Sequence, residues 1–205
     1  HKYKLRADVE LGIADGFLVS ALMGKDSFEV PSDCAIFVDP RLAVMGRRVI
    51  LTKNNTDLFE KQGLVAGHPD DYHKLRIENS LPDGARDMTP EKALLLENGF
   101  DELSGIAWDK GCYVGQELTA RTKYRGLVKK RLLPVTFEGD APESGSDITL
   151  DGKTAGEMKS SCGVMGLALL RLERLEQAID TAQPLTVGNT VLKVQIPAWV
   201  KGVRN

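Results

Sequence analysis

The stretch from residue 110 to residue 121 brings together side chains capable of covalent, acid–base and electrostatic chemistry. It reads Lys-Gly-Cys-Tyr-Val-Gly-Gln-Glu-Leu-Thr-Ala-Arg, so a thiol, an ammonium group, an amide, a carboxylate and a guanidinium fall within one short segment. Gly111 and Gly115 flank Cys112 and let the backbone turn sharply on both sides of the sulfur. We expect a short helical turn after Gly115. A helix N-terminus and the nearby Lys110 both favour thiolate over thiol, which makes Cys112 a candidate reactive thiol.

Two interpretations of Cys112 are consistent with its neighbours. In the first it is a functional thiol, acting as a nucleophile, a redox group or a transient contact to a metal cluster. In the second it is a small buried hydrophobic residue at a glycine-rich turn, which is the usual fate of a free cysteine. A nucleophile needs a base within hydrogen-bond reach. The three histidines of the chain, His1, His68 and His73, are all distant from Cys112 in the sequence. Only folding would bring one of them to the thiol.

Four polar residues accompany the thiol and are the other candidate residues of the reactive site: Lys110, Gln116, Glu117 and Arg121. Lys110 is expected to hold the thiolate electrostatically, and Glu117 to accept hydrogen bonds that fix the turn. The alternative is a solvated helix start with an i,i+4 pair between Glu117 and Arg121, worth roughly a few tenths of a kcal/mol. That alternative accounts for Glu117 and Arg121 but gives no reason for a lysine at residue 110.

The segment from Lys110 to Glu117 resembles the K-G-C-Y-x-G-Q-E signature of the YgfZ family. These proteins are folate-binding relatives of the glycine-cleavage T-protein (aminomethyltransferase), and they include mitochondrial iron–sulfur assembly factors. Further family landmarks are matched in the same order: Asp39-Pro40-Arg41 with Met45-Gly46, Arg76-Ile77-Glu78 with Pro82, and Gly166-Leu167-Ala168-Leu169-Leu170. The resemblance covers nearly the whole chain. Family members usually carry roughly another half-domain before the segment that resembles His1–Val9.

The resemblance also implies a tetrahydrofolate site, with Tyr72, Glu78 and Tyr113 as its contacts. T-protein relatives place a glutamate of an R-x-E stretch on the pterin edge, and Arg76-Ile77-Glu78 looks similar. Tyr72 falls where YgfZ relatives carry an aromatic residue near the folate. The alternative is an ordinary helix with a half-buried tyrosine and a surface glutamate. The arginine that T-proteins carry shortly before the equivalent of the signature has no counterpart here.

Composition limits the function classes. With 205 residues and a net charge of −2, the chain can bury a sizeable core and is not a wholesale polyanion binder. Its three cysteines are far apart in the sequence, which argues against a disulfide framework and a preformed metal site. We therefore expect no stably bound metal, with Cys112 as a possible transient cluster contact. No apolar run reaches membrane-spanning length, so no membrane partner is expected. The expected compartment is reducing: the cytoplasm of a bacterium, or the mitochondrial matrix of a eukaryote.

The first part of the chain is expected to mix strands and helices. Asp15-Gly16 predicts a hairpin between two strands, and Pro69 predicts the start of a helix that ends by Asn79. The remaining elements are less sharply marked. The full set of expected elements is strands at Leu5–Ile13, Phe17–Leu22, Ala35–Val38 and Arg48–Leu51, and helices at Thr56–Gln62 after a Thr56 cap, at Pro69–Asn79 and after Pro90.

The last part of the chain predicts a small barrel. Six short strands are expected at Leu132–Phe137, Ile148–Leu150, Thr154–Met158, Val164–Arg171, Leu185–Val187 and Thr190–Ile196. Asp151-Gly152 and Gly188-Asn189 are tight-turn dipeptides, and strands at this spacing are typical of an antiparallel barrel. The expected fold is α+β. It has an incomplete T-protein-like folate-binding domain over residues 1–130, followed by a small antiparallel C-terminal β-barrel over residues 131–205.

A basic run follows the signature, with six positive charges in eleven residues: Arg121, Lys123, Arg125, Lys129, Lys130 and Arg131. Such a run can contact RNA phosphates, a polyglutamyl folate tail or an acidic partner protein. The alternative is a solvated face. No recognised RNA-binding signature accompanies it, so direct nucleic acid binding is not expected.

The leading hypothesis is a folate-binding protein that supports iron–sulfur cluster assembly or repair through Cys112, and tRNA modification only indirectly. Its expected partners are folate and the iron–sulfur assembly proteins or client enzymes. It would be an accessory factor rather than an enzyme. The alternative is a tetrahydrofolate-dependent aminomethyltransferase of the glycine-cleavage type. A third hypothesis is a tRNA-binding module, whose salt-sensitive affinity would fall when Lys129, Lys130 and Arg131 are neutralised.

Overall fold

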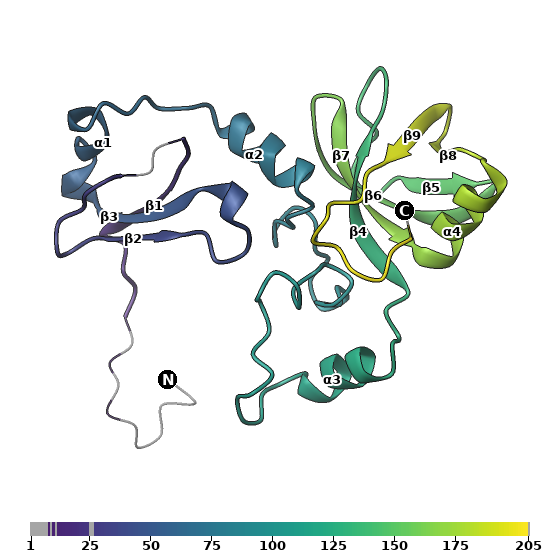
Figure 1. The fold of residues 1–205 in the computed structure, drawn as a ribbon, viewed down its shortest axis with the longest axis horizontal. Helices are drawn as coiled ribbons and strands as arrows, with labels where there is room; N and C mark the ends of the chain where they lie inside the picture. The colour runs from purple at the N-terminus through teal and green to yellow at the C-terminus, as the bar shows by residue number, and fades with distance from the viewer. Residues whose placement is uncertain (1–7, 9, 11, 25–26, 205) are drawn as a thin grey trace. The chain divides into compact units, whose positions relative to one another are not determined.

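The computed structural model describes residues 8, 10, 12–24 and 27–204 (Figure 1). By their contacts, the residues divide into two compact units, His1–Ala66 and Gly67–Asn205. The predicted division into domains, between residues 130 and 131, stays a prediction. Within the described part of the chain, no helix combines the length and the apolar character needed to span a membrane.

The first unit contains a three-stranded antiparallel sheet in the order β1-β3-β2. Three of the predicted strands are confirmed, but most of the predicted strand Leu5–Ile13 lies outside the described residues. The helix predicted at Thr56–Gln62 is shorter than expected, and Asp57 rather than Thr56 precedes it. The elements are β1 (Phe17–Leu22), β2 (Ala35–Val38), η1 (Ala43–Met45), β3 (Arg47–Thr52), η2 (Lys53–Asn55) and α1 (Leu58–Lys61).

One of the family landmarks has a structural explanation in the turn after β2. Asp39 is buried and accepts hydrogen bonds from the side chains of Arg41 (2.7 Å to Oδ2) and Arg48 (2.9 Å). Burial alone would raise the pKa of Asp39, but these hydrogen bonds outweigh it and lower the pKa to about 2. Asp39 therefore ties the turn to β3.

The Met45-Gly46 landmark also has a structural explanation. Gly46 has φ +71°, and a Cβ there would lie 2.2 Å from the carbonyl oxygen of Leu22. The position accepts only glycine because the backbone conformation and the close approach of β1 both exclude a side chain. Met45 beside it is fully buried. These landmarks thus stabilise the fold of the first unit.

The second unit is built around a closed six-stranded antiparallel barrel in the order β4-β7-β6-β5-β8-β9, which confirms the predicted barrel (Figure 1). The sequence patterns did not predict the helix α4, which follows β7. The elements of this unit are α2 (Pro69–Glu78), α3 (Gln116–Tyr124), β4 (Lys130–Thr136), β5 (Asp147–Leu150), β6 (Lys153–Cys162), β7 (Met165–Arg171), α4 (Leu172–Thr181), β8 (Leu185–Val187) and β9 (Thr190–Val194).

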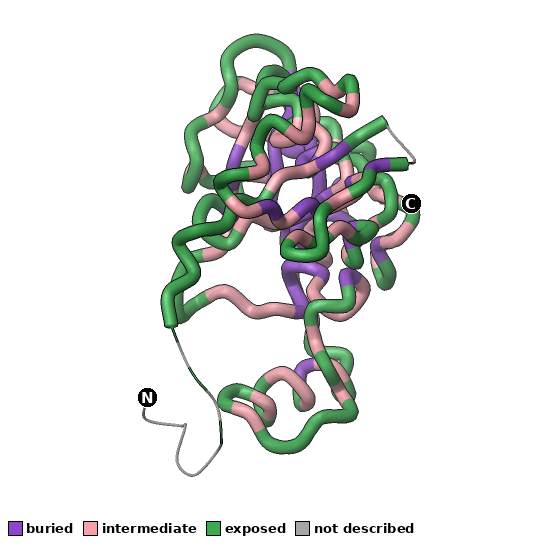
Figure 2. The backbone as a smooth tube through the Cα atoms, turned by 90° about the vertical axis from the view of Figure 1, so that its left-hand side faces the viewer, coloured by how far each residue is buried: buried purple, intermediate pink, exposed green. Residues whose placement is uncertain are grey.

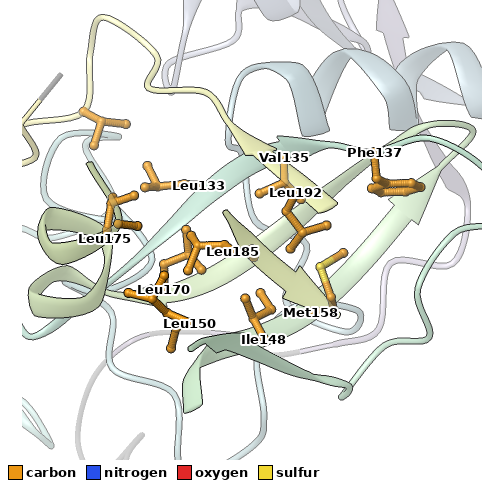
Figure 3. Packing of buried hydrophobic residues seen from close by; sticks show 14 residues of the cluster. Leu133, Val135, Phe137, Ile148, Leu150, Met158, Leu170, Leu175, Leu185 and Leu192 are labelled. Atoms are coloured by element: carbon orange, nitrogen blue, oxygen red, sulfur yellow. The ribbon is translucent and has the colours of Figure 1, made fainter. Parts of the chain in front are cut away.

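The barrel interior is the main hydrophobic core, and its side chains converge from all six strands and α4 (Figure 3). Leu133 and Val135 of β4 point into this core, and both are fully buried. Leu132 points to the other side of β4 and packs with Ile77 of α2 and Leu167 of β7. Strand β4 is therefore buried on both faces. Buried residues gather in the middle of this unit (Figure 2).

The irregular segment between α2 and α3 is held by contacts to β4 and to the C-terminal segment. The hydroxyl of Ser80 donates to the carbonyl of Leu132 at 2.7 Å. The indole of Trp199 donates to the carbonyl of Asn79 at 2.9 Å and covers Gly99, where a Cβ would lie 2.7 Å from the ring. The helix predicted after Pro90 is wrong, because residues 90–92 form turns.

Candidate functional site

Cys112 lies on an exposed loop that leads into α3, as the sequence predicted, and its thiol is free. The interpretation of Cys112 as a buried thiol is therefore wrong. Gly115 precedes the helix with φ +85° and meets no other atom at its Cβ position, so the turn needs glycine for its conformation rather than for space. Gly111 has neither a positive φ nor a close neighbour. Only the second of the two glycines is required by the backbone.

The predicted site residues Cys112, Gln116, Glu117 and Arg121 line one depression of roughly 520 Å³ at the start of α3. Tyr113 lines the same depression. Glu117 and Arg121 form no ion pair within the described part of the chain, so the alternative based on that pair is not supported by the geometry. The arrangement presents a thiol, a carboxylate, an amide and a guanidinium together to solvent.

Lys110 and Tyr113 face each other beside this depression. The Lys110 ammonium nitrogen lies 4.6 Å from the centre of the Tyr113 ring, which is a cation–π distance. The hydroxyl of Tyr113 is buried and has no hydrogen-bond partner among the residues that the structure describes. The expected action of Lys110 on the Cys112 thiolate stays a prediction, because the contact that the structure gives this ammonium group is with the tyrosine ring.

Helix α3 is anchored by a cluster that the sequence patterns did not predict. Asp101 accepts hydrogen bonds from the indole of Trp108 (2.7 Å) and from the ammonium group of Lys123 (3.1 Å). Lys123 also lies 4.0 Å from the centre of the Trp108 ring. Burial acts to raise the pKa of Asp101, but the two hydrogen bonds prevail and lower it. This cluster fixes the end of α3 and leaves its beginning free to present the motif.

Tyr72 and Glu78 both lie on α2, which confirms the predicted helix. Tyr72 is half-buried and Glu78 is exposed. Six positions along an α-helix turn through about 240°, so the two side chains leave α2 on different sides. Within the described residues, neither lines the depression that contains Cys112. Their role as folate contacts stays a prediction.

Arg76, from the R-x-E stretch, is a buried structural residue. Its guanidinium donates to the carboxylate of Asp87 (2.6 Å), to the hydroxyl of Ser160 (2.6 Å) and to the carbonyl of Leu81 (3.0 Å). The backbone N–H of Ser160 in turn donates to Asp87 at 3.0 Å. This network joins α2, the loop after it and β6, so it packs the residues before the barrel against the barrel wall.

His73 lies between two guanidinium groups. Its Nδ1 accepts a hydrogen bond from Nε of Arg76 at 2.8 Å, and its Nε2 lies 3.3 Å from a guanidinium nitrogen of Arg86. Burial and these positive charges lower the pKa of His73. The other described histidine, His68, caps α2 by accepting from the backbone N–H of Asp70 at 3.2 Å. Both histidines have structural partners on or next to α2.

The predicted basic run is not one exposed patch. Arg131 is buried, and its guanidinium donates to the carboxylate of Glu102 (2.7 Å) and to the carbonyl of Leu96 (2.9 Å). Lys123 is engaged by Asp101, as described above. Arg131 and Lys123 are therefore structural, which weakens the hypothesis of RNA binding through this run. Its exposed members are Arg121, Arg125 and Lys129.

Among the described residues, no group of three or more histidine, cysteine, aspartate and glutamate side chains is arranged to hold a metal ion. Cys34 and Cys162 are half-buried free thiols. Cys34 belongs to the first unit, and Cys162 ends β6 in the second unit.

Comparison with known proteins identifies the barrel. Residues 129–202 match the model of the family described as "CAF17, C-terminal beta-barrel domain". The chain is 39% identical over 169 residues to "Iron-sulfur cluster assembly factor IBA57, mitochondrial" of Mus musculus and 37% identical over 171 residues to the Homo sapiens protein of that name. Each alignment covers 78% of this chain and 46% of the relative.

A similar protein of Dictyostelium discoideum, "Iron-sulfur cluster assembly factor IBA57 homolog, mitochondrial", is 33% identical over 159 residues. That alignment covers 71% of this chain and 39% of the relative. The chain spans about half the length of the mammalian relatives that it matches. The barrel therefore matches the CAF17 C-terminal domain, and the chain is similar to the IBA57 factors over part of their length. These matches support the predicted family in its broader form, while membership of the YgfZ branch stays a prediction.

Proposed function

We propose that this protein, which is similar to part of the IBA57 factors, supports iron–sulfur cluster assembly or repair, with the Cys112 thiol as its essential group. The observation that carries the proposal is the exposed, free Cys112 at the start of α3, within the eight-residue signature. The names of the similar proteins support the process, and the exposure of the thiol supports its participation.

In this proposal, the site contributes one exposed thiolate as a ligand to iron and does not form a complete metal-binding site. A thiolate is a good ligand for iron in iron–sulfur clusters, and such clusters are usually held by several cysteines. The described residues offer no group of three metal-ligating side chains. In this proposal the cluster is cargo, and a partner protein or client enzyme supplies the other ligands while Cys112 makes a transient contact.

The polar residues around Cys112 have supporting roles in the proposal. Glu117, Gln116 and Arg121 line the same depression as the thiol and would contact the partner that carries the cluster. Lys110 would favour the thiolate form through its charge. The partners would be assembly proteins or client enzymes, and any effect on tRNA modification would pass through iron–sulfur enzymes.

A reduced folate is the proposed small-molecule ligand, with Tyr72, Glu78 and Tyr113 as its contacts. This part of the proposal is based on the family resemblance. The proposed location is the mitochondrial matrix in a eukaryote, which the names of the relatives support, or the cytoplasm in a bacterium.

The test uses cells that lack this protein, complemented with the natural gene or with its Cys112→Ser variant. A [4Fe–4S] enzyme is assayed beside an enzyme that contains no iron. We expect the variant to accumulate normally but to leave the iron–sulfur enzyme inactive, because serine keeps the shape of the exposed side chain and removes the thiol. The iron-free enzyme should be unaffected.

Matched controls are Cys34→Ser and Cys162→Ser, which remove half-buried thiols elsewhere. Both should restore the iron–sulfur enzyme. Full rescue by the Cys112→Ser variant would show that the thiol is dispensable and would overturn this mechanism. Purified protein holding a stable cluster through its own three cysteines would overturn the transient-cargo interpretation.

A further inference from the structure

Helix α3 has one solvent-facing side that continues the surface around Cys112. A hollow of about 430 Å³ is lined by five of its residues: Glu117, Ala120, Arg121, Tyr124 and Arg125. They recur at intervals of three and four positions, so they share one side of the helix. Glu117 and Arg121 also line the depression that contains Cys112, as does Leu118. Leu118 and the five residues of the hollow together form the α3 face.

Two guanidinium groups of the α3 face have no partner. Arg121 and Arg125 are exposed and lie one helical turn apart, a spacing at which like charges disfavour a helix. Within the part of the chain that the structure describes, neither side chain forms an ion pair or a hydrogen bond. By contrast, Lys123 on the same helix is paired with Asp101. The two arginines are therefore available for an anionic group of another molecule.

Exposed apolar groups accompany the two arginines. Tyr124 is 76% exposed, and its ring meets the edge of the Trp108 ring, with the ring centroids 6.2 Å apart. Leu118, three positions before Arg121, is 56% exposed. Tyrosine and arginine are enriched among the residues that carry most of the binding energy of protein–protein interfaces. The composition of the α3 face is thus typical of a protein-binding surface.

The charges of the α3 face indicate the chemistry of its partner. Guanidinium groups bind carboxylates strongly, because they can donate two parallel hydrogen bonds to one carboxylate. Glu117 lies on the same face and would repel the successive phosphates of an RNA strand. A partner protein can avoid this repulsion by placing a neutral or basic side chain opposite Glu117. An acidic protein segment therefore fits the α3 face better than RNA does.

We infer that the α3 face binds an acidic, amphipathic segment of the protein that carries the iron–sulfur cluster. Two carboxylates of that segment bind Arg121 and Arg125, and an apolar side chain packs against Leu118 and Tyr124. The inference rests on the proposed function and adds to it the chemistry of the partner. Because the α3 face adjoins the Cys112 depression, a segment bound there holds the partner beside the thiol.

The test replaces Tyr124 with the photo-crosslinking amino acid p-benzoylphenylalanine in the full-length protein, in its own cells. Mass spectrometry identifies the crosslinked protein and the linked peptide. We expect an iron–sulfur assembly protein or client enzyme, linked through a segment that has at least two acidic side chains and an apolar one. The same amino acid at Val191, which is 47% exposed on β9 of the barrel, is the control position and should not crosslink to that protein.

Charge variants show whether the arginines bind the partner. Arg125→Glu should lower the crosslinking yield at least tenfold, because it replaces attraction by repulsion. Lys153→Glu is the matched control, since it makes the same change of net charge at an exposed residue of β6. It should leave the yield within twofold. Leu118→Ala should lower the yield at least threefold. A lysine in place of one carboxylate of the linked segment should restore at least half of the yield lost in Arg125→Glu.

The inference would be overturned by the absence of a crosslinked protein at Tyr124, by a crosslink to RNA, by a linked segment without acidic residues, or by a yield that Arg125→Glu does not change. Cys112→Ser should keep the crosslink, because the α3 face does not include the thiol. Full rescue of the iron–sulfur enzyme by Cys112→Ser contradicts the proposed function, whatever the crosslink shows. If Cys112→Ser is inactive and the crosslink is absent, the inference about the α3 face alone is wrong.

Discussion

From Arg131 to Val135, strand β4 buries five consecutive residues, whereas between Asp109 and Leu118 only Tyr113 and Gln116 are not exposed. The strand is covered on one face by the barrel core and on the other by Ile77, Met165 and Leu167. The motif segment is held mainly by the Asp101 cluster near the end of α3.

Within one compact unit, the buried barrel is thus distinct from the exposed segment that contains the candidate site. The free energy of unfolding comes chiefly from buried apolar area and from buried polar groups that are hydrogen-bonded. The barrel core provides the apolar area, and the buried network of Arg76, Asp87 and Ser160 provides the hydrogen-bonded polar groups. Binding and reaction need side chains that remain accessible, and loops held by a rigid scaffold usually provide them. Substitutions should therefore affect folding in the barrel region and activity in the motif segment.

The largest effect on stability is expected from breaking the buried network of Arg76, Asp87 and Ser160. Arg76→Ala should lower the free energy of unfolding by about 3–5 kcal/mol, because it leaves the buried carboxylate of Asp87 without its charged partner. Urea unfolding measures the change. Arg86→Ala is the matched control, since Arg86 is exposed, and should cost less than about 1 kcal/mol. Equal costs for the two variants would contradict the structural role assigned to Arg76.

A leucine pair compares the two regions directly. Leu133→Ala should cost about 2–5 kcal/mol, because it opens a cavity in the fully buried barrel core. Leu118→Ala on α3 should change stability by no more than about 0.5 kcal/mol, since Leu118 is 56% exposed. Urea unfolding gives both values, provided that the free energy of unfolding depends equally steeply on urea concentration in the two variants. A large cost at Leu118 would mean that the motif segment is part of the folding core.

A glycine pair tests the turn within the motif. Gly115→Ala should cost about 1–2 kcal/mol, because alanine is strained at φ +85°. Gly111→Ala should be nearly neutral, since it meets no atom within 4 Å and lacks a positive φ. Thermal unfolding and the amide NMR shifts of α3 would detect the difference. Similar behaviour of the two variants would show that the Gly115 turn is not what starts the helix.

The smallest effect is expected from pH, through His73. Because its pKa is lower in the folded state than its ordinary value of 6.5, the unfolded chain binds this proton first as pH falls. The contribution of His73 to stability should therefore be present above pH 6.5, decrease as pH falls through that value, and level off below the folded pKa. Urea unfolding of the natural protein and of His73→Gln at several pH values measures this contribution of His73. A difference between them that stays constant or grows toward low pH would contradict this assignment.

Local patterns in the sequence predicted much of the barrel and α2. The barrel strands are short segments separated by turn dipeptides such as Asp151-Gly152, and α2 begins at Pro69. Helix α4 was missed although Leu172, Leu175 and Ile179 have helical spacing. It has no side-chain cap, and Ala182 rather than glycine adopts the left-handed conformation at its end. The usual signals for helix ends were therefore absent.

The sequence by itself determined which residues are the chemical candidates, since Cys112 and its polar neighbours lie within one short segment. Only the tertiary structure decided that this thiol is exposed, that Arg131 is buried against Glu102, and that Arg76 joins α2 to the barrel. The physical reason is the range of the interactions. Turns and strand alternation depend on residues a few positions apart, whereas Arg76 and Ser160 are 84 residues apart and meet only when the barrel has formed.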